Sequence, residues 1–167
     1  MNTQEDKKKT KKNKKAQVPA YNPIDDIREL IDNCMYDDAM EQLEILQEKE
    51  PDNYEVNYEL ARIYFEMGDY NSAIANYEEV LLHQQSSIMY YNLGMAYEAN
   101  DEIDKAISSY LKCLTVNEKF SLANKKLGIL FMARGDMDSA KEFFTDYIEA
   151  DIPEVEKDQV RKILDRI

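Results

Sequence analysis

The residues best suited to catalysis are few and lie far apart in the sequence. His83 is the only histidine, and its imidazole could act as a general base near neutral pH. Cys34 and Cys113 are the only thiols, and neither lies near His83 in sequence. No Cys/His cluster has zinc-ligand spacing, and the four glycines are isolated instead of forming a phosphate-binding loop. We therefore predict that the protein is not an enzyme and has no metal, cofactor or small-molecule substrate.

Charge is spread unevenly along the 167 residues. Residues 1–20 hold seven lysines, at positions 7–15, against Glu5 and Asp6, so this segment carries +5 and the other 147 residues carry −18 of the net −13. No apolar residue lies between Met1 and Ala16, so the segment buries too little surface to offset its chain entropy. We predict a disordered basic tail at residues 1–19, and favour a solvated tail over one that contacts nucleic acid or anionic membrane, because neither arginine nor aromatic residues accompany the lysines.

Composition limits the class of protein to which the rest of the chain can belong. A hydrophobic content of 44% suffices for a packed interior, and two cysteines cannot form a disulfide framework. No apolar run approaches the ~18 residues of a membrane-spanning helix. The first residues lack the ~7–15-residue apolar stretch of a secretory signal, which predicts a cytoplasmic protein.

From residue 21 onward the sequence repeats itself. Small residues recur at intervals of 34, 33 and 34, at Ala39, Ala73, Ala106 and Ala140. Larger apolar residues keep the same steps, at Leu43, Tyr77, Tyr110 and Phe144 and again at Leu30, Tyr64, Tyr97 and Phe131. Because every register loses one residue at the same place, the sequence indicates four copies of one unit, with a deletion in the polar linker at 83–87.

Within each unit the apolar spacing predicts two helices joined by a tight corner. Gly68 and Gly135 stand at two of the corners, where glycine adopts left-handed torsions without a Cβ clash. The aspartate after the glycine, or Asn71 and Ser72 beyond it, can cap the next helix. Cys34 and Asp101 occupy the other two corners, so we expect those to be less well terminated. In the helix interiors, Gly94 and Gly128 predict the close approach of a neighbouring helix.

The pattern Leu60-Ala61…Tyr64…Gly68-Asp69-Tyr70…Ala73…Tyr77, with its counterparts around Gly94 and Gly128, resembles the tetratricopeptide repeat. The resemblance spans units at 20–53, 54–86, 87–120 and 121–153, and a capping helix at 154–167 follows, with Val160, Ile163, Leu164 and Ile167 on one face. It implies an all-α, right-handed α-solenoid of about four helix hairpins, whose first helices line a concave groove.

The helix period places eight residues of the expected first helices in this groove as candidate partner-binding residues: Tyr58, Arg62, Tyr91, Asn92, Met95, Lys125, Lys126 and Ile129. Tyrosine, methionine and arginine suit binding surfaces because they give large, adaptable contacts. The polar members predict a local basic site for a carboxylate, and the opposite end, with Asp25, Glu55, Glu59 and Glu66, should prefer a basic segment. Alternatively, Tyr58 and Tyr91 pack between neighbouring helices, and the lysines are solvated.

These expectations favour a non-catalytic protein-binding adaptor or co-chaperone that presents a groove to a peptide or helix of a partner protein. The alternative is an oligomeric scaffold whose basic N-terminal tail contacts nucleic acid or anionic membrane. The sequence does not name the partner.

Overall fold

The computed structural model describes residues 22–167, and this part of the chain forms nine helices and no strand. The helices are α1 Pro23–Asp32, α2 Tyr36–Lys49, α3 Tyr54–Glu66, α4 Tyr70–His83, α5 Ser87–Ala99, α6 Ile103–Val116, α7 Ser121–Ala133, α8 Met137–Glu149 and α9 Glu154–Leu164. The prediction of a tail at residues 1–19 lies outside the described residues. His83, placed by the sequence in a linker, is instead the last residue of α4.

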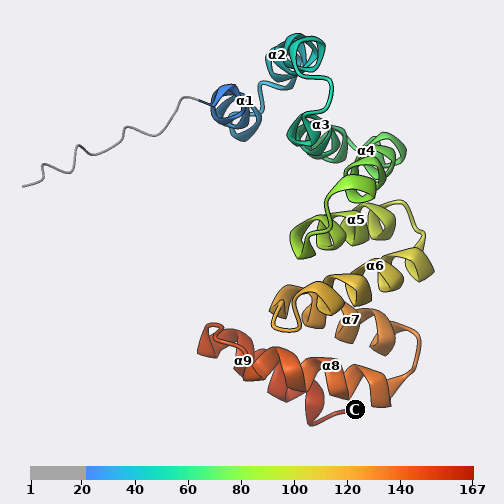
Figure 1. Ribbon diagram of the computed structural model, residues 1–167. Helices are drawn as coiled ribbons and strands as arrows, with labels where there is room; N and C mark the ends of the chain where they lie inside the picture. The colour runs from blue at the N-terminus through green and yellow to red at the C-terminus, as the bar shows by residue number, and fades with distance from the viewer. Residues whose placement is uncertain (1–21) are drawn as a thin grey trace, which may run out of the picture.

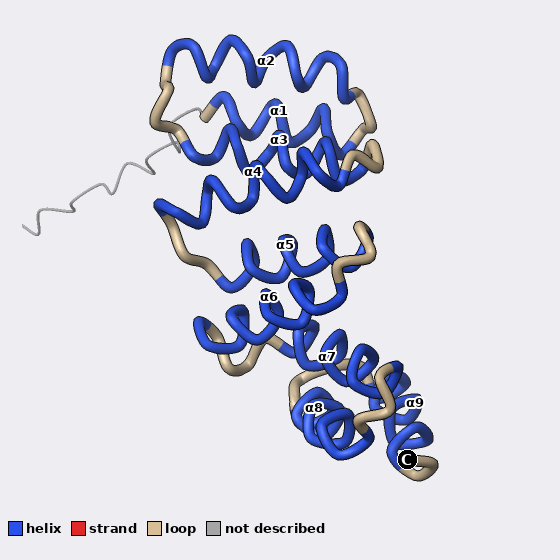
Figure 2. Tube along the Cα trace, turned by 90° about the vertical axis from the view of Figure 1, so that its right-hand side faces the viewer, coloured by secondary structure: helices blue, strands red, loops and turns tan. Residues whose placement is uncertain are grey.

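The helices stack in chain order as four hairpins, α1–α2, α3–α4, α5–α6 and α7–α8, followed by α9. Figure 1 shows them along an arc, with α1, α3, α5, α7 and α9 on its inner side and the even-numbered helices outside. Figure 2, from the side, shows the same stack of antiparallel pairs. The predicted all-α array of hairpins is confirmed, and each proposed unit range holds one hairpin. No helix formed by residues 22–167 is both long and apolar enough to span a bilayer.

All four hairpin corners use the same backbone turn. Gly68 and Gly135 have φ of +80° and +79°, and Cys34 and Asp101 adopt the same left-handed region at +59° and +61°. The residue after each donates its N–H to the carbonyl five residues earlier, as from Asp69 to Tyr64 at 2.9 Å and from Glu102 to Tyr97 at 2.8 Å. The corners at 34 and 101 therefore strain a side-chain-bearing residue where the other two use glycine.

The corners also differ in how the next helix begins. Asp69 caps α4 by accepting from the backbone N–H of Ser72 at 3.2 Å, and Asp136 caps α8 through Ser139 in the same way at 3.1 Å. The N-cap residues of α2 and α6 make no such side-chain hydrogen bond. The first helix of every hairpin ends with the same backbone bonds, and the poorer termination expected at Cys34 and Asp101 is not seen there. These two corners differ only in their non-glycine residue and in the missing side-chain cap of the next helix.

Small residues let the two helices of a hairpin approach closely. A Cβ added to Gly94 would lie 2.5 Å from the Tyr110 ring, and one added to Gly128 would lie 2.7 Å from the Phe144 ring. Both distances are shorter than any ordinary carbon contact, so the α5–α6 and α7–α8 pairs require glycine there. The mid-helix glycines thus have the packing role that their positions predict.

The last helix covers the end of the array. The predicted apolar face of α9 packs on α8, where Val160 is buried against Phe144 and Tyr147. The α-helix ends at Leu164, and Ile167 beyond it still packs on this cluster. This end of the stack is therefore closed by the chain itself.

Candidate partner-binding groove

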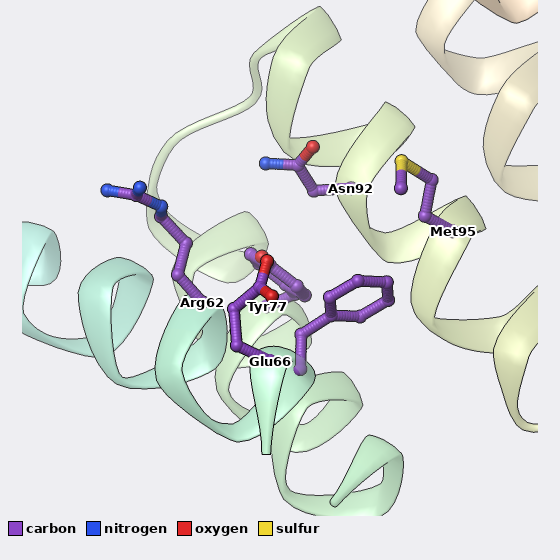
Figure 3. A pocket seen from close by; sticks show the side chains of 6 residues that line it. Arg62, Glu66, Tyr77, Asn92 and Met95 are labelled. Carbon is purple, nitrogen blue, oxygen red and sulfur yellow. The ribbon is translucent and has the colours of Figure 1, made fainter. Parts of the chain in front are cut away.

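A small hollow on the inner side of the arc brings together three of the eight predicted residues. Arg62 on α3 and Asn92 and Met95 on α5 line a pocket of about 130 Å³. Figure 3 shows Asn92 and Met95 on one side of the pocket and Arg62 and Glu66 on the other. Phe65 and Tyr77 complete the lining. The pocket thus joins apolar walls to several hydrogen-bonding groups, as a binding site for one side chain requires.

The two predicted groove tyrosines are half-buried and hold helices together. The Tyr58 hydroxyl accepts a hydrogen bond from Asn92 Nδ2 at 3.1 Å, and its ring meets Tyr77 edge-on at 6.0 Å. The Tyr91 ring lies 5.6 Å from Tyr110 and 5.2 Å from Phe120. Burial raises the pKa of both hydroxyls. Much of each ring therefore packs between helices, which was the alternative interpretation of these tyrosines.

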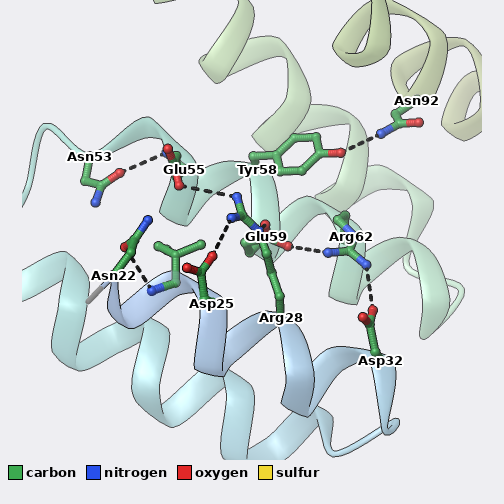
Figure 4. A network of polar contacts seen from close by, with 11 residues as sticks. Asn22, Asp25, Arg28, Asp32, Asn53, Glu55, Tyr58, Glu59, Arg62 and Asn92 are labelled. Atoms are coloured by element: carbon green, nitrogen blue, oxygen red, sulfur yellow. Dashed lines mark hydrogen bonds and ion pairs between the residues drawn. The ribbon is translucent and has the colours of Figure 1, made fainter. Parts of the chain in front are cut away.

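Glu59, expected at the acidic end of the groove, is instead fully buried with 0% exposure. It accepts from Arg28 Nε at 2.6 Å and from Arg62 Nη1 at 2.7 Å, so it joins α1 to α3 (Figure 4). Burial by itself lowers the pKa of Arg62, but the charge and hydrogen bonds of Glu59 outweigh it and the pKa is raised. A buried carboxylate needs such partners, and the helix period alone cannot reveal them.

The remaining bonds of the two arginines leave this end of the groove acidic. Arg28 also pairs with Asp25 at 3.2 Å and with Glu55 at 3.3 Å, and Arg62 pairs with Asp32 at 3.2 Å. Two guanidinium groups therefore face four carboxylates, counting Glu59. The network carries a net charge of −2, so Arg62 adds no surplus positive charge to the pocket.

The predicted basic residues farther along the array do not gather into one site. Lys126 Nζ lies 3.0 Å from Glu98 Oε2, and the Tyr110 hydroxyl donates to the same oxygen at 2.8 Å. Lys125 pairs with Glu156 of α9 at 3.0 Å. A ligand carboxylate would have to compete with these internal carboxylates for either lysine.

Exposed apolar side chains continue along the first helices of the last two hairpins. Ile129 on α7 is 41% exposed, and Ile88 on α5 and Leu122 on α7 are exposed to a similar degree. Two larger hollows, one at the start of α7 beside the end of α8 and one at the α1–α2 hairpin, contain none of the eight predicted residues.

Of the three side chains considered for catalysis, Cys113 and His83 make packing contacts, whereas Cys34 is exposed at the first corner. Cys113 is fully buried, and burial raises the pKa of its thiol to about 11. The His83 ring stacks on Tyr54 with centroids 4.1 Å apart. Among residues 22–167, no group of three or more His, Cys, Asp and Glu is placed to hold a metal ion.

Comparison with known proteins agrees with this geometry. Two family models described as tetratricopeptide repeat match residues 30–96 and 87–120, which together cover more than half of the chain. The chain belongs to the tetratricopeptide repeat family.

Individual relatives are more distant. The chain is 35% identical over 72 residues to a photosystem I assembly protein, Ycf3, of Prochlorococcus marinus, a match that covers 41% of this chain and 42% of that protein. A tetratricopeptide repeat protein from Parabacteroides merdae superposes with a TM-score of 0.75 at 23% identity, over 85% of this chain and 57% of the other. YrrB, described as a TPR protein with an unusual peptide-binding site, superposes with a TM-score of 0.68 at 18% identity, over 77% and 67%. At these identities the two structures share the fold alone.

The repeat register identifies the residue of the pocket that sequence reasoning missed. Tyr77 was assigned only to the core, and it is 98% buried, yet it lines the pocket. Its counterpart one repeat later, Tyr110, bonds to Glu98. Phe65 stands at the position equivalent to Glu98, so the Tyr77 hydroxyl has no carboxylate partner. The substitution of phenylalanine for glutamate at one repeat position was the signal in the sequence.

Proposed function

We propose that this protein is a non-catalytic adaptor or co-chaperone that binds an extended segment or helix of a partner protein along its inner face. The partner-binding residues are Tyr58, Arg62, Tyr91, Asn92, Met95, Lys125, Lys126 and Ile129. We also propose that the protein acts in the cytoplasm. The observation that carries it is the pocket lined mainly by residues of α3 and α5, two helices on the inner side of the arc.

Several features support a docking surface at this place. The pocket offers Met95 and Phe65 for apolar contact and Arg62 and Asn92 for hydrogen bonds, all from adjacent helices of a rigid stack. The exposed Ile129 extends the apolar contact onto α7. A preformed surface lowers the entropy cost of ordering a ligand segment. Tetratricopeptide repeats as a class are protein-interaction domains, in accord with this role.

The curated relatives favour a role in which one protein holds another. Ycf3 is named a photosystem I assembly protein, and the present chain spans about four tenths of its length. We extend to this chain only the general activity of holding a protein partner. The identity of that partner does not follow from the shared segment.

Affinity capture from lysate of the source organism tests the proposal. The full-length protein is compared with Met95→Glu, which places a charge in the pocket wall, and with Ile129→Glu on α7. Ser108→Glu, at an exposed position of the outer helix α6, is the matched control. We expect the two inner-face variants to lose a partner that wild type and Ser108→Glu both retain, as quantified by mass spectrometry.

Circular dichroism and thermal melting verify that each variant is folded. Equal capture of the same partners by folded Met95→Glu, Ile129→Glu and wild type would contradict the inner face as the docking surface. Loss of the partner with Ser108→Glu alone would indicate that the interface lies on the outer helices.

A further inference from the structure

Equivalent inner-face positions in two successive repeats hold different side chains. Where the third and fourth repeats meet, the ammonium group of Lys126 lies against Glu98, and Tyr110 donates to that carboxylate. One repeat earlier, the equivalent positions hold Asn92, Phe65 and Tyr77. Asn92 is shorter than lysine and Phe65 is uncharged, and the pocket of about 130 Å³ lies there.

A tyrosine hydroxyl at this pocket has no hydrogen-bond partner among the described residues. Tyr77 is 2% exposed and lines the pocket, and its hydroxyl makes no hydrogen bond to any group in residues 22–167. Tyr110 and Tyr147, also buried, each donate to a carboxylate. In the described part of the chain the buried side-chain oxygen without a partner is Asn124 Oδ1, so solvent reaches the Tyr77 hydroxyl at the pocket. The hydroxyl can therefore accept a hydrogen bond from a ligand that displaces this water.

The charged residues around the pocket determine whether it favours a cationic or an anionic ligand. The guanidinium of Arg62 is already paired with Glu59 and Asp32. Glu66 lines the pocket, is exposed, and forms no ion pair with the described residues. With the neighbouring network at −2, the pocket disfavours a carboxylate and favours a cation.

We propose that the pocket between α3 and α5 takes a lysine side chain of the partner protein, whose ammonium group occupies the place that Lys126 fills one repeat later. This inference rests on the proposed function, because it names the chemistry that the inner face recognises. It differs from the carboxylate expected at Arg62 and Asn92, and it agrees with the basic segment expected at Glu66.

The pocket provides for each part of a lysine side chain. Its volume of about 130 Å³ admits one side chain. Phe65 and Met95 offer apolar surface to the methylene stem. An ammonium group has three donors, and Glu66, the Tyr77 hydroxyl and Asn92 Oδ1 are acceptors at the pocket, because Asn92 uses its Nδ2 on Tyr58.

Titration of the full-length protein with small probes tests this by NMR, with the Met95 methyl resonance as the reporter. The probes are the Nα-acetyl, N-methylamide derivatives of lysine, of norleucine, which has a similar stem but no charge, and of glutamate. We expect the lysine probe to bind about tenfold more tightly than the norleucine probe, and the glutamate probe not to saturate.

Two variants locate the bound ammonium. Glu66→Gln should weaken binding of the lysine probe about five- to tenfold, because it removes the negative charge that pairs with the ammonium group. Tyr77→Phe should weaken it about threefold, because it removes the hydroxyl acceptor and keeps the ring. Glu44→Gln, at an exposed position of α2, is the matched control and should leave the affinity unchanged. The double variant Phe65→Glu with Asn92→Lys rebuilds the arrangement of the next repeat and should abolish binding of the probe.

The outcomes separate this inference from the proposed function. If the norleucine or glutamate probe binds as tightly as lysine, or if Glu66→Gln has no effect, the inference is overturned, while loss of a captured partner with Met95→Glu would still support the docking groove. If the lysine probe binds only after the lysines at positions 7–15 of the full chain are changed to glutamine, the occupant is the chain's own segment, and the proposal of a partner's lysine is wrong.

Discussion

The second repeat (α3–α4) and the third (α5–α6) are built from the same pattern but solve three local problems differently. At the closest approach of the two helices, the second repeat has Ala61 and the third has Gly94, which contacts the Tyr110 ring. At the corner, Gly68 in the second is matched by Asp101 in the third. On the inner face, the second leaves a pocket beside Tyr77, whereas Glu98 and Lys126 satisfy Tyr110 in the third.

This comparison indicates that the third repeat stabilises the stack, whereas the second leaves inner-face groups available to a partner. The third repeat is internally satisfied on its inner face, with every polar group of the Tyr110–Glu98–Lys126 arrangement bonded within the chain. The second repeat has a glycine corner and an inner face on which Tyr77 and Glu66 make no hydrogen bond or ion pair within the described residues. A stack of repeats can tolerate this, because each hairpin is also stabilised by its neighbours.

The largest effect is expected from a substitution that disrupts the closest helix contact of the third repeat. Gly94→Ala places a Cβ 2.5 Å from the Tyr110 ring, so we expect a loss of about 1–3 kcal/mol of unfolding free energy in urea denaturation. Ala61→Gly, the reciprocal change in the second repeat, adds no clash and should cost only about 1 kcal/mol through helix propensity. Unchanged stability of Gly94→Ala would mean that the ring is not seated as described.

The second prediction compares the two inner-face glutamates. Glu98→Gln weakens the bonds to both Lys126 and Tyr110, so we expect a loss of about 1–2 kcal/mol, measured by urea denaturation. Glu66→Gln should change stability by less than about 0.5 kcal/mol, because Glu66 is exposed and forms no ion pair in the described part of the chain. Equal effects of the two changes would remove the contrast between a satisfied and an open inner face.

The third prediction exchanges the corners. Asp101→Gly relieves a left-handed torsion of +61° and should stabilise the protein by about 1 kcal/mol, seen as a higher melting temperature. Gly68→Ala imposes the same strain at φ +80° and should destabilise it by a similar amount, although open space surrounds the new methyl group. A destabilising Asp101→Gly would show that the aspartate side chain contributes more than its torsion costs.

The smallest expected effect is a pH dependence of stability that comes from Asp69, the N-cap residue of α4. Hydrogen bonds from the Ser72 hydroxyl and then its backbone N–H lower the pKa of Asp69. A lowered folded-state pKa gives stability that is present above the unfolded pKa of about 3.9 and is lost as the pH falls through the folded value. We therefore expect the stability difference between wild type and Asp69→Asn, followed by thermal melting, to shrink below pH ~4. Asp136→Asn should behave in the same way, and a difference that is constant with pH would contradict the cap.

Much of the fold could be predicted because it is encoded locally. The 34-, 33- and 34-residue steps located the helices, Gly68 and Gly135 located two corners, and Gly94 and Gly128 located the closest contacts. Each of these signals reflects a constraint on one residue's own backbone or on its nearest helix neighbour. His83 was misplaced because a helix end can extend into a polar stretch without changing the apolar pattern.

The candidate site was predicted only in part. Arg62, Asn92 and Met95 were expected in the groove and line the pocket, but the helix period could not show that Glu59 beside them is buried between two arginines. The period gives the direction of a side chain, whereas its partners come from helices some 30 residues away in sequence. For that reason the sequence could not show that carboxylates of Glu59 and Asp32 neutralise Arg62.

The sequence by itself determined that the chain forms helix pairs, because the repeated apolar spacing has to be buried between neighbouring helices. The resemblance to the tetratricopeptide repeat implied which helices lie on the inner side. Only the tertiary structure decided which inner-face polar groups remain open to a partner. Arg28, Arg62, Lys125 and Lys126 are all neutralised by carboxylates from other segments, while Tyr77 and Glu66 are left without such partners in the described residues. Charge pairing depends on distances of a few ångströms across helices, and no one-dimensional pattern specifies them.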